Sequence, residues 1–304
     1  PVGNNWSARM GSMSASSDNA DAVKALTHQP SLSDREFNQL RELVFRHTSI
    51  SLGENKRELV RTRIGKILRR RTMSSYGEYC EFMNSDAVSP EDIEELANAI
   101  STNLTSFFRE NAHFVFLTEK GIPAMLAAKQ NGVRRLRAWS AGCSTGEEAY
   151  TMGITFLEKI PGLATWDFRI LATDLDTNVL RKAQGGVYEA RQVEAVPPLL
   201  RQKYFQQGTG ENKGLYKVKE SLRRLITFKR LNLMDPYPFR GPFDVIFCRN
   251  VMIYFDKPTQ TRIIQRYYDL LGPGGYLFVG HSESLTGIDH RFQYVQPTVY
   301  MKAR

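Results

Sequence analysis

Length, composition and charge exclude several classes of protein. The chain has 304 residues, 41% of them hydrophobic, and a formal net charge of +9. These values are ordinary for a soluble globular protein, and the length suggests two domains. No run of about 18 apolar residues occurs, so we expect no transmembrane helix. Residues 1–30 lack the apolar core of a signal peptide, and we interpret them as a tag remnant followed by a disordered polar arm.

The cysteines and histidines give no sign of a disulfide framework or a metal site. The three cysteines lie far apart, and no CxxC pair is present. The five histidines show no HExxH or HxxxH spacing, so we expect no bound metal. This cysteine usage is typical of the reducing cytoplasm.

Positive charge is concentrated in two segments. Residues 56–71 hold eight basic residues and one acid, and residues 201–230 hold nine basic residues and two acids. The first segment has helical periodicity, with apolar residues on one stripe and Arg63, Lys66 and Arg70 on another. The basic stripe suits phosphates or rows of carboxylates, and a solvated helix face explains it equally well.

The N-terminal third has a helical pattern. Ser33 and Glu36 have the spacing of a capping box at the start of an amphipathic run. A second such run covers residues 89–100, with Pro90 near its start and acids in its first turn. We therefore expect an all-helical domain over residues 31–105.

After residue 133, short β-type runs alternate with helical stretches. This alternation is typical of βαβ units in a parallel, doubly wound sheet. We expect an α/β domain over residues 106–304, with ligands at the carboxyl ends of its strands. Residues 204–224 break the alternation, because glycine-rich turns there surround an alternating LYKVK run. That pattern predicts a small antiparallel β insert.

Polar or glycine-rich loops follow four successive predicted strands. The first loop contains Gly142 and fits neither a P-loop nor a GxGxxG motif. Asp174 ends the second strand and could accept the hydroxyls of a ribose. Asn232 follows the third strand, and Arg249 and Asn250 follow the fourth. Together these residues suit an adenosine-containing cofactor and favour S-adenosylmethionine over NAD.

Beyond these loops, Arg109 stands at the seam of the two halves, where an arginine could bind a carboxylate through two hydrogen bonds. From Ser31 to the C-terminus the chain resembles the chemotaxis receptor methyltransferases, the CheR-type protein-glutamate O-methyltransferases. The resemblance is carried by five ordered stretches: TNLTSFFRE (102–110), WSAGCSTGEEAY (139–150), ATDLDTNVL (172–180), FDVIFCRNVMIYFD (243–256) and GPGGYLFVGHSE (272–283).

The resemblance implies a fold and an activity. The fold would be a class I S-adenosylmethionine-dependent methyltransferase domain with a Rossmann-like sheet and a small antiparallel β insert, preceded by an all-helical domain that recognises the receptor. The activity would be methyl transfer to glutamate carboxylates of chemoreceptor cytoplasmic helices, for chemotactic adaptation. The products would be glutamyl methyl esters and S-adenosylhomocysteine.

The resemblance also implies partners. We expect a cytoplasmic monomer that binds the helical bundle of a chemoreceptor, and the β insert could bind the receptor's C-terminal peptide. No nucleic acid, membrane insertion or metal is expected.

The resemblance assigns roles to residues of this chain. Arg109 and Tyr254 would be catalytic, and the basic stripe Arg63, Lys66 and Arg70 would contact the receptor. The cofactor-binding residues would be Asn103, Thr105 and Arg109 at the junction, Gly142 in the glycine loop, Glu148 at the methionine end, Asp174 at the ribose, Asn232 and Leu233 beside the adenine, and Arg249 and Asn250 closing the pocket.

Two other functions stay open. A nucleic-acid methyltransferase would also need basic patches, and residues 235–238 (DPYP) are similar to a motif that holds a flipped base. They follow the third strand, however, whereas that motif follows the fourth. The second alternative is a non-catalytic module that senses S-adenosylmethionine, and the presence of both Arg109 and Tyr254 weighs against it.

Overall fold

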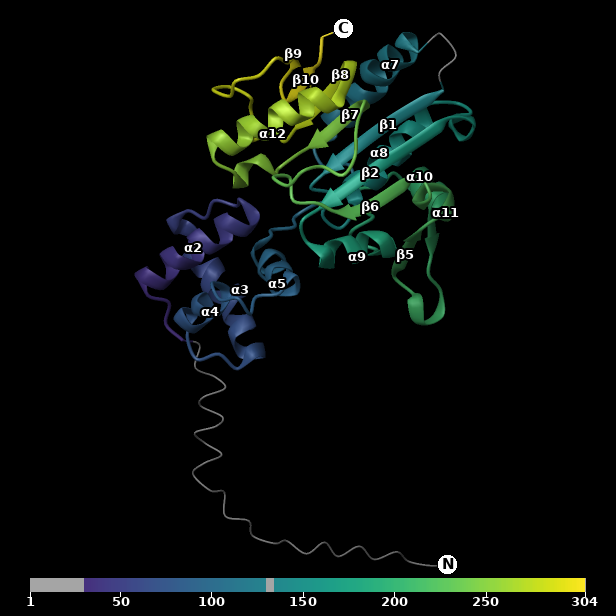
Figure 1. Ribbon diagram of the computed structural model, residues 1–304. Helices are drawn as coiled ribbons and strands as arrows, with labels where there is room; N and C mark the ends of the chain where they lie inside the picture. The colour runs from purple at the N-terminus through teal and green to yellow at the C-terminus, as the bar shows by residue number, and fades with distance from the viewer. Residues whose placement is uncertain (1–29, 130–133, 304) are drawn as a thin grey trace, which may run out of the picture.

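The structure, a computed structural model, describes residues 30–129 and 134–303. The expected arm over residues 1–30 lies outside the described residues, apart from Pro30. A group of N-terminal helices stands beside a larger α/β part (Figure 1). Among the residues described, no helix combines the length and the apolar character that crossing a membrane requires.

The N-terminal helices form a domain with its own core. Ser33 and Glu36 make the predicted capping box at the start of the first helix, and Ser89 and Asp92 make another at the start of the last. The apolar faces of the helices meet in one buried cluster, which includes the predicted apolar stripe of α3. The elements are α2 (Asp34–Thr48), the 3-10 turn η1 (Glu54–Lys56), α3 (Arg57–Arg71), α4 (Tyr76–Met83) and α5 (Pro90–Ile100).

A seven-stranded sheet forms the centre of the larger part. Its order is β6-β2-β1-β7-β8-β10-β9, in which the first five strands are parallel and β10 is antiparallel to both of its neighbours. The connections reverse direction between β1 and β7, where a doubly wound sheet opens a crevice for ligands. The strands are β1 (Arg135–Ala141), β2 (Asp167–Asp174), β6 (Ile226–Arg230), β7 (Phe243–Cys248), β8 (Leu271–Val279), β9 (Gln293–Gln296) and β10 (Val299–Met301).

Both faces of this sheet are buried under helices. Along β1, Leu136 and Ala138 belong to one core and Trp139 and Ala141 to the other, because successive side chains of a strand point to opposite faces. α8 packs in the first core and α12 in the second. The helical elements are α6 (Ala112–Phe116), the π-helical turn η2 (Leu117–Gly121), α7 (Ile122–Ala128), α8 (Glu147–Lys159), η3 (Leu163–Thr165), α9 (Thr177–Gly185), η5 (Met252–Tyr254) and α12 (Lys257–Leu270).

The small β insert is present but differs from the expected segment 204–224. It begins earlier, because β3 (Val187–Glu189) pairs antiparallel with β5 (Leu215–Val218), whose other edge takes β4 (Phe205–Gln207). A strand of three residues is too short to show alternation in the sequence. The segment also ends in a short helix rather than a strand. The other elements of the insert are α10 (Pro198–Tyr204), η4 (Gly210–Asn212) and α11 (Glu220–Arg223).

The helical domain lies at the carboxyl ends of the parallel strands (Figure 1). Asn98 of α5 exchanges two hydrogen bonds of 3.0 Å with Thr177, which follows β2. The Ser51 amide donates a hydrogen bond of 2.8 Å to the carbonyl of Tyr254, which follows β7. These contacts hold the helical domain over the edge of the sheet at which the loops predicted to bind a ligand emerge.

Candidate functional site

A cleft that is open to solvent at its mouth lies between the two domains. Thr48 and Ile50 contribute one side of the cleft, and loops after β1, β2, β6 and β7 contribute the other. Every residue expected to contact the cofactor or the reacting carboxylate lines it: Asn103, Thr105, Arg109, Gly142, Glu148, Asp174, Asn232, Leu233, Arg249, Asn250 and Tyr254.

The glycine loop after β1 is held close to the turn after β7. Gly142 has a φ of +86°, and a Cβ there would lie 2.4 Å from Cγ2 of Val251. Gly146 has a φ of +97° and precedes the first residue of α8. A side chain at either position would strain the backbone, and at position 142 it would also clash. Because these two positions carry no side chain, the backbone of the loop can line the cleft without filling it.

Asp174, at the end of β2, is a half-buried carboxylate held by backbone amides. Its Oδ2 accepts a hydrogen bond of 2.8 Å from the Ser144 amide, and its Oδ1 accepts one of 3.0 Å from the Asp176 amide. Burial raises the pKa of Asp174 to about 6, although both amides favour the ionised form. The Leu175 amide also favours the ionised form through a hydrogen bond. A carboxylate has about four acceptor positions, so this one can still receive a ligand hydroxyl.

Arg249 is the centre of a buried network of charges. Its side chain is 2% exposed, and its Nη2 and Nη1 lie 3.0 Å from Glu110 Oε2 and 3.2 Å from Glu148 Oε2. Burial raises the pKa of Glu148 against the opposing effect of Arg249. Burial acts in the same direction on Glu110, but Arg249 and further hydrogen bonds outweigh it and hold the pKa of Glu110 below its ordinary value. Glu148 also accepts a hydrogen bond of 2.6 Å from Ser140.

Arg109 and Tyr254 differ from these residues because their functional groups contact no side-chain partner among the described residues. Arg109 donates to the Leu104 carbonyl at 2.6 Å, and no carboxylate among the described residues forms an ion pair with it. The Tyr254 hydroxyl makes no hydrogen bond within residues 30–129 and 134–303, although the ring packs against the helical domain. Both residues line the cleft, and each can accept a new hydrogen-bond partner.

The asparagines of the cleft connect neighbouring segments. Asn103 donates a hydrogen bond of 2.7 Å to Asp176, which also caps α9. Asn232 donates to the His47 carbonyl at 3.3 Å, and Asn250 donates to Glu110 Oε1 at 3.3 Å. Each therefore has a structural task besides any contact with a ligand.

Sequence reasoning assigned no role to Glu283, which fixes the turn after β7. Its Oε2 accepts hydrogen bonds from the amides of Asn250 (2.8 Å) and Gly280 (2.5 Å), and its Oε1 accepts one from Ile253 (3.3 Å). A single glutamate after a strand has no spacing that indicates such a role. Only its place in the GHSE stretch could have drawn attention to it.

The basic stripe of α3 lies along a second groove, which also contains Glu91, Glu94 and Glu95. Arg63 donates to three carbonyls at the end of α5, and Arg70 pairs with Glu95. Lys66 is exposed and has no ion-pair partner in the described part of the chain. Of the three residues expected to contact a receptor, Lys66 alone thus has no structural partner there.

Comparison with known proteins gives the family. Residues 35–101 match the CheR methyltransferase all-alpha domain, and residues 103–301 match the CheR methyltransferase SAM binding domain. A chemotaxis protein methyltransferase 2 of Pseudomonas aeruginosa is 43% identical over 88% of this chain and 93% of its own length. A probable chemotaxis protein methyltransferase of Rhizobium etli is 41% identical over 85% and 96%. A chemotaxis protein methyltransferase of Escherichia coli is 38% identical over 90% and 93%.

These matches confirm the resemblance found in the sequence. Together with the observed sheet, they confirm the class I fold with its all-helical N-terminal domain and small antiparallel sheet. The chain belongs to the CheR methyltransferase family of S-adenosylmethionine-dependent methyltransferases.

Proposed function

We propose that this protein transfers the methyl group of S-adenosylmethionine to glutamate side chains on the cytoplasmic helical bundle of a chemoreceptor, for chemotactic adaptation. The names of its relatives, chemotaxis protein methyltransferases, support the biological setting. The observation that carries the proposal is that the guanidinium of Arg109, which has no ion-pair partner among the described residues, lines the same cleft as the phenol of Tyr254, which makes no hydrogen bond there. Both groups suit a carboxylate that arrives from outside.

The cofactor would be bound mainly by the loops at the carboxyl ends of the parallel strands. Asp174 would take the ribose hydroxyls, and Asn232 and Leu233 would flank the adenine. Glu148, one of the carboxylates next to Arg249, would face the ammonium group of the methionine end. Gly142, Asn103, Thr105 and Asn250 would complete the site. When bound, S-adenosylmethionine supplies an electrophilic methyl group on a sulfonium.

For this reaction the protein has mainly to position the attacking carboxylate. A glutamate has an unperturbed pKa of about 4.3, so its carboxylate is already an anion at neutral pH and needs no general base. A carboxylate oxygen forms a bond to the methyl carbon while the bond from carbon to sulfur breaks. The products are a glutamyl methyl ester and S-adenosylhomocysteine. Arg109 and Tyr254 would hold the carboxylate in line for this displacement.

The receptor would approach along the groove of α3, where Lys66 can meet an acidic helix. The expected contact between the β insert and a receptor C-terminal peptide stays a prediction, as do the cytoplasmic location and the monomeric state.

The test is transfer of labelled methyl from S-adenosylmethionine to three acceptors: a receptor cytoplasmic fragment, RNA and DNA. We expect labelling of the receptor fragment alone, and release of the label as methanol in mild alkali, as expected for an ester. Replacing the acceptor glutamates by alanine should abolish labelling. Labelling of RNA or DNA would favour a nucleic-acid methyltransferase. Cofactor binding without labelling of any acceptor would favour a sensor module.

A further inference from the structure

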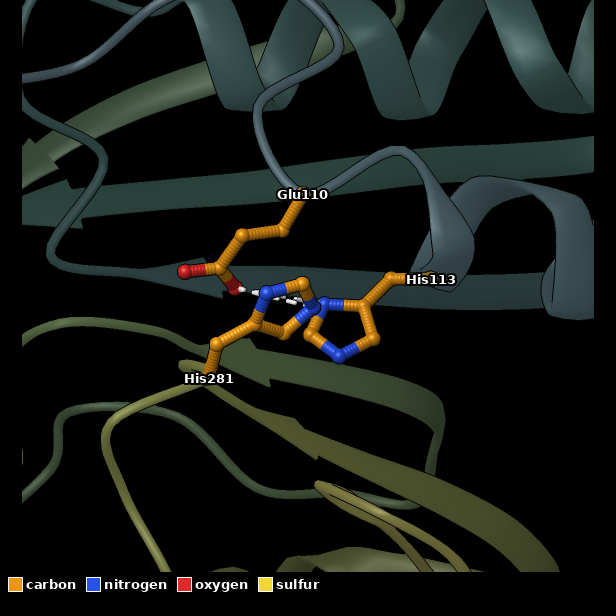
Figure 2. Close-up of side chains that lie close together, drawn as sticks. All are labelled: Glu110, His113 and His281. Carbon is orange, nitrogen blue, oxygen red and sulfur yellow. Dashed lines mark ion pairs between the residues drawn. The ribbon is translucent and has the colours of Figure 1, made fainter.

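Three side chains that could bind a metal meet behind the cleft. Glu110 and His113 come from the junction segment, and His281 comes from the loop after β8 (Figure 2). Glu110 Oε2 lies 3.6 Å from His113 Nδ1 and 3.9 Å from His281 Nε2. One ligand atom from each residue lies within 4.8 Å of the other two. None of the three residues lines the cleft, although Glu110 contacts Arg249 and Asn250, which do.

His113 is anchored through one ring nitrogen, and its other ring nitrogen faces Glu110. Its Nε2 lies 2.6 Å from the Thr298 hydroxyl, and its Nδ1 lies 3.6 Å from Glu110 Oε2.

His113 Nδ1 has no hydrogen-bond partner among the described atoms. The residue is 1% exposed, and a buried polar nitrogen without a partner is unfavourable. A cation bound between this nitrogen and the Glu110 carboxylate would satisfy it. The exposed His281 supplies a third ligand atom, its Nε2.

We propose that Glu110, His113 and His281 bind one divalent transition-metal ion of the zinc class. Two imidazole nitrogens and one carboxylate oxygen form a ligand set typical of Zn²⁺, Co²⁺ or Ni²⁺, whereas Mg²⁺ and Ca²⁺ prefer oxygen ligands alone. In a tetrahedral zinc site, ligand atoms are about 3.3 Å apart. The separations of 3.6 Å and 3.9 Å from Glu110 Oε2 are close to this value, and the exposed His281 side chain would move to bring the two histidine nitrogens together. The contact between His113 Nε2 and the Thr298 hydroxyl is of the kind that supports ligating histidines from the outer shell.

The ion would connect the junction segment that carries Arg109 to the loop that carries Glu283. Its role would be structural, because the three ligands lie outside the cleft. Arg249 donates to the same Glu110 oxygen, so the ion must share that oxygen with a guanidinium. This positive neighbour lowers the expected affinity, and the second carboxylate on Arg249, from Glu148, partly offsets it.

The test uses the whole chain, freed of metal with a chelator and then titrated with Co²⁺ and with Zn²⁺. We expect one ion per chain, a Co²⁺ absorption spectrum of the four-coordinate type, and a rise in the unfolding temperature with Zn²⁺. His281 is 55% exposed, so His281→Ala should fold normally. We expect it to weaken binding by at least about tenfold, since even outer-shell changes cost that much.

His290→Ala is the matched control, because His290 lies in the same loop as His281 but belongs to no such cluster among the described residues. It should bind Co²⁺ and Zn²⁺ as the wild type does. The proposal is overturned if the wild type shows no saturable binding, or if His281→Ala binds as tightly as His290→Ala. Neither result bears on the proposed methyl transfer, because metal binding is measured without cofactor or receptor.

Discussion

Two regions of the cleft hold their polar groups differently. In the region of Asp174, Glu148 and Arg249, both carboxylates accept hydrogen bonds on both oxygens, and Arg249 is paired with two carboxylates. In the region of Arg109 and Tyr254, neither side chain has a side-chain partner among the described residues. The difference separates groups that are held in place before any ligand binds from groups that are ready to receive one.

This difference suggests a division of work. Groups that are fixed in advance bind a cofactor without the entropic cost of ordering them. Groups without a partner can bind a carboxylate that must enter, react and leave as an ester. If this division is correct, equivalent substitutions in the two regions should differ in their effects on stability, cofactor binding and turnover.

The largest difference should appear between the two arginines. Arg249→Ala leaves Glu110 and Glu148 partly buried without their cation, and removing one partner of a buried ion pair costs about 3–5 kcal/mol. Arg109→Ala breaks no ion pair and removes one hydrogen bond to a carbonyl, so it should cost about 1 kcal/mol or less. Urea unfolding of both variants measures the free energy of unfolding. Equal losses of stability in the two variants would contradict the distinction between the two regions of the cleft.

Tyr254→Phe should act on turnover and leave binding alone. It deletes a hydroxyl that makes no hydrogen bond within the described residues, and loss of a positioning donor costs about 10²–10³ in kcat. The dissociation constant for cofactor, measured by calorimetry, should stay within about twofold of the wild-type value. Tyr294→Phe, at an exposed ring on β9, is the control and should leave both quantities unchanged. A Tyr254→Phe enzyme with normal kcat would exclude the phenol from the mechanism.

Asp174 should make cofactor binding depend on pH. Its pKa of about 6 means that the ionised fraction falls about tenfold between pH 7 and pH 5, and we expect cofactor affinity to fall with it. Asp174→Asn should bind at least about tenfold more weakly at pH 7, since two charge-assisted hydrogen bonds are weakened, and should lose this pH dependence. Calorimetry at pH 5, 6 and 7 tests both statements. A wild-type affinity that does not change with pH would contradict the ribose assignment.

The raised pKa of Asp174 makes cofactor affinity rise with pH, but it makes the stability of the folded state fall as the pH rises. The pKa of Asp174 in the folded protein lies above the unfolded value near 3.9, so the folded state binds the proton more tightly. Its contribution to stability is therefore fully present below about pH 4 and is lost as the pH rises through about 6.

The smallest effect should come from Lys66 on α3. An exposed charge contributes about 0.2–1 kcal/mol to a contact, so Lys66→Glu should lower kcat/KM for the receptor fragment about two- to fivefold. The defect should shrink at high salt, because screening weakens both attraction and repulsion. Lys120→Glu is the control, since this exposed lysine lies in η2 of the other domain. Reversing Arg63 would be a poor test, because Arg63 holds the end of α5.

Much of the fold could be predicted because its signals are local. The capping box of Ser33 and the apolar stripe of α3 depend on residues within a few positions of one another. The residues at the strand ends could also be predicted to meet, since parallel strands bring their carboxyl ends to one edge. β3 could not be predicted, because its three residues become a strand only when they pair with β5.

The parts that could not be predicted depend on contacts between distant segments. Arg63 has the periodicity of an outward-facing residue, yet it folds back onto carbonyls of α5. Glu283 holds amides of another turn. The histidine spacing indicated no metal site, yet the fold brings His113 and His281 together around Glu110. Neither periodicity nor motif spacing carries information of this kind.

The most direct test of the division of work is single-turnover methyl transfer to a receptor cytoplasmic fragment by Asp174→Ala and Arg109→Ala. Saturating cofactor should restore Asp174→Ala to within about threefold of the wild-type rate, because that substitution would affect binding alone. Arg109→Ala should remain at least about 100-fold slow at any cofactor concentration, because the attacking carboxylate would no longer be held in line. An Arg109→Ala enzyme that excess cofactor restores to the wild-type rate would contradict the account.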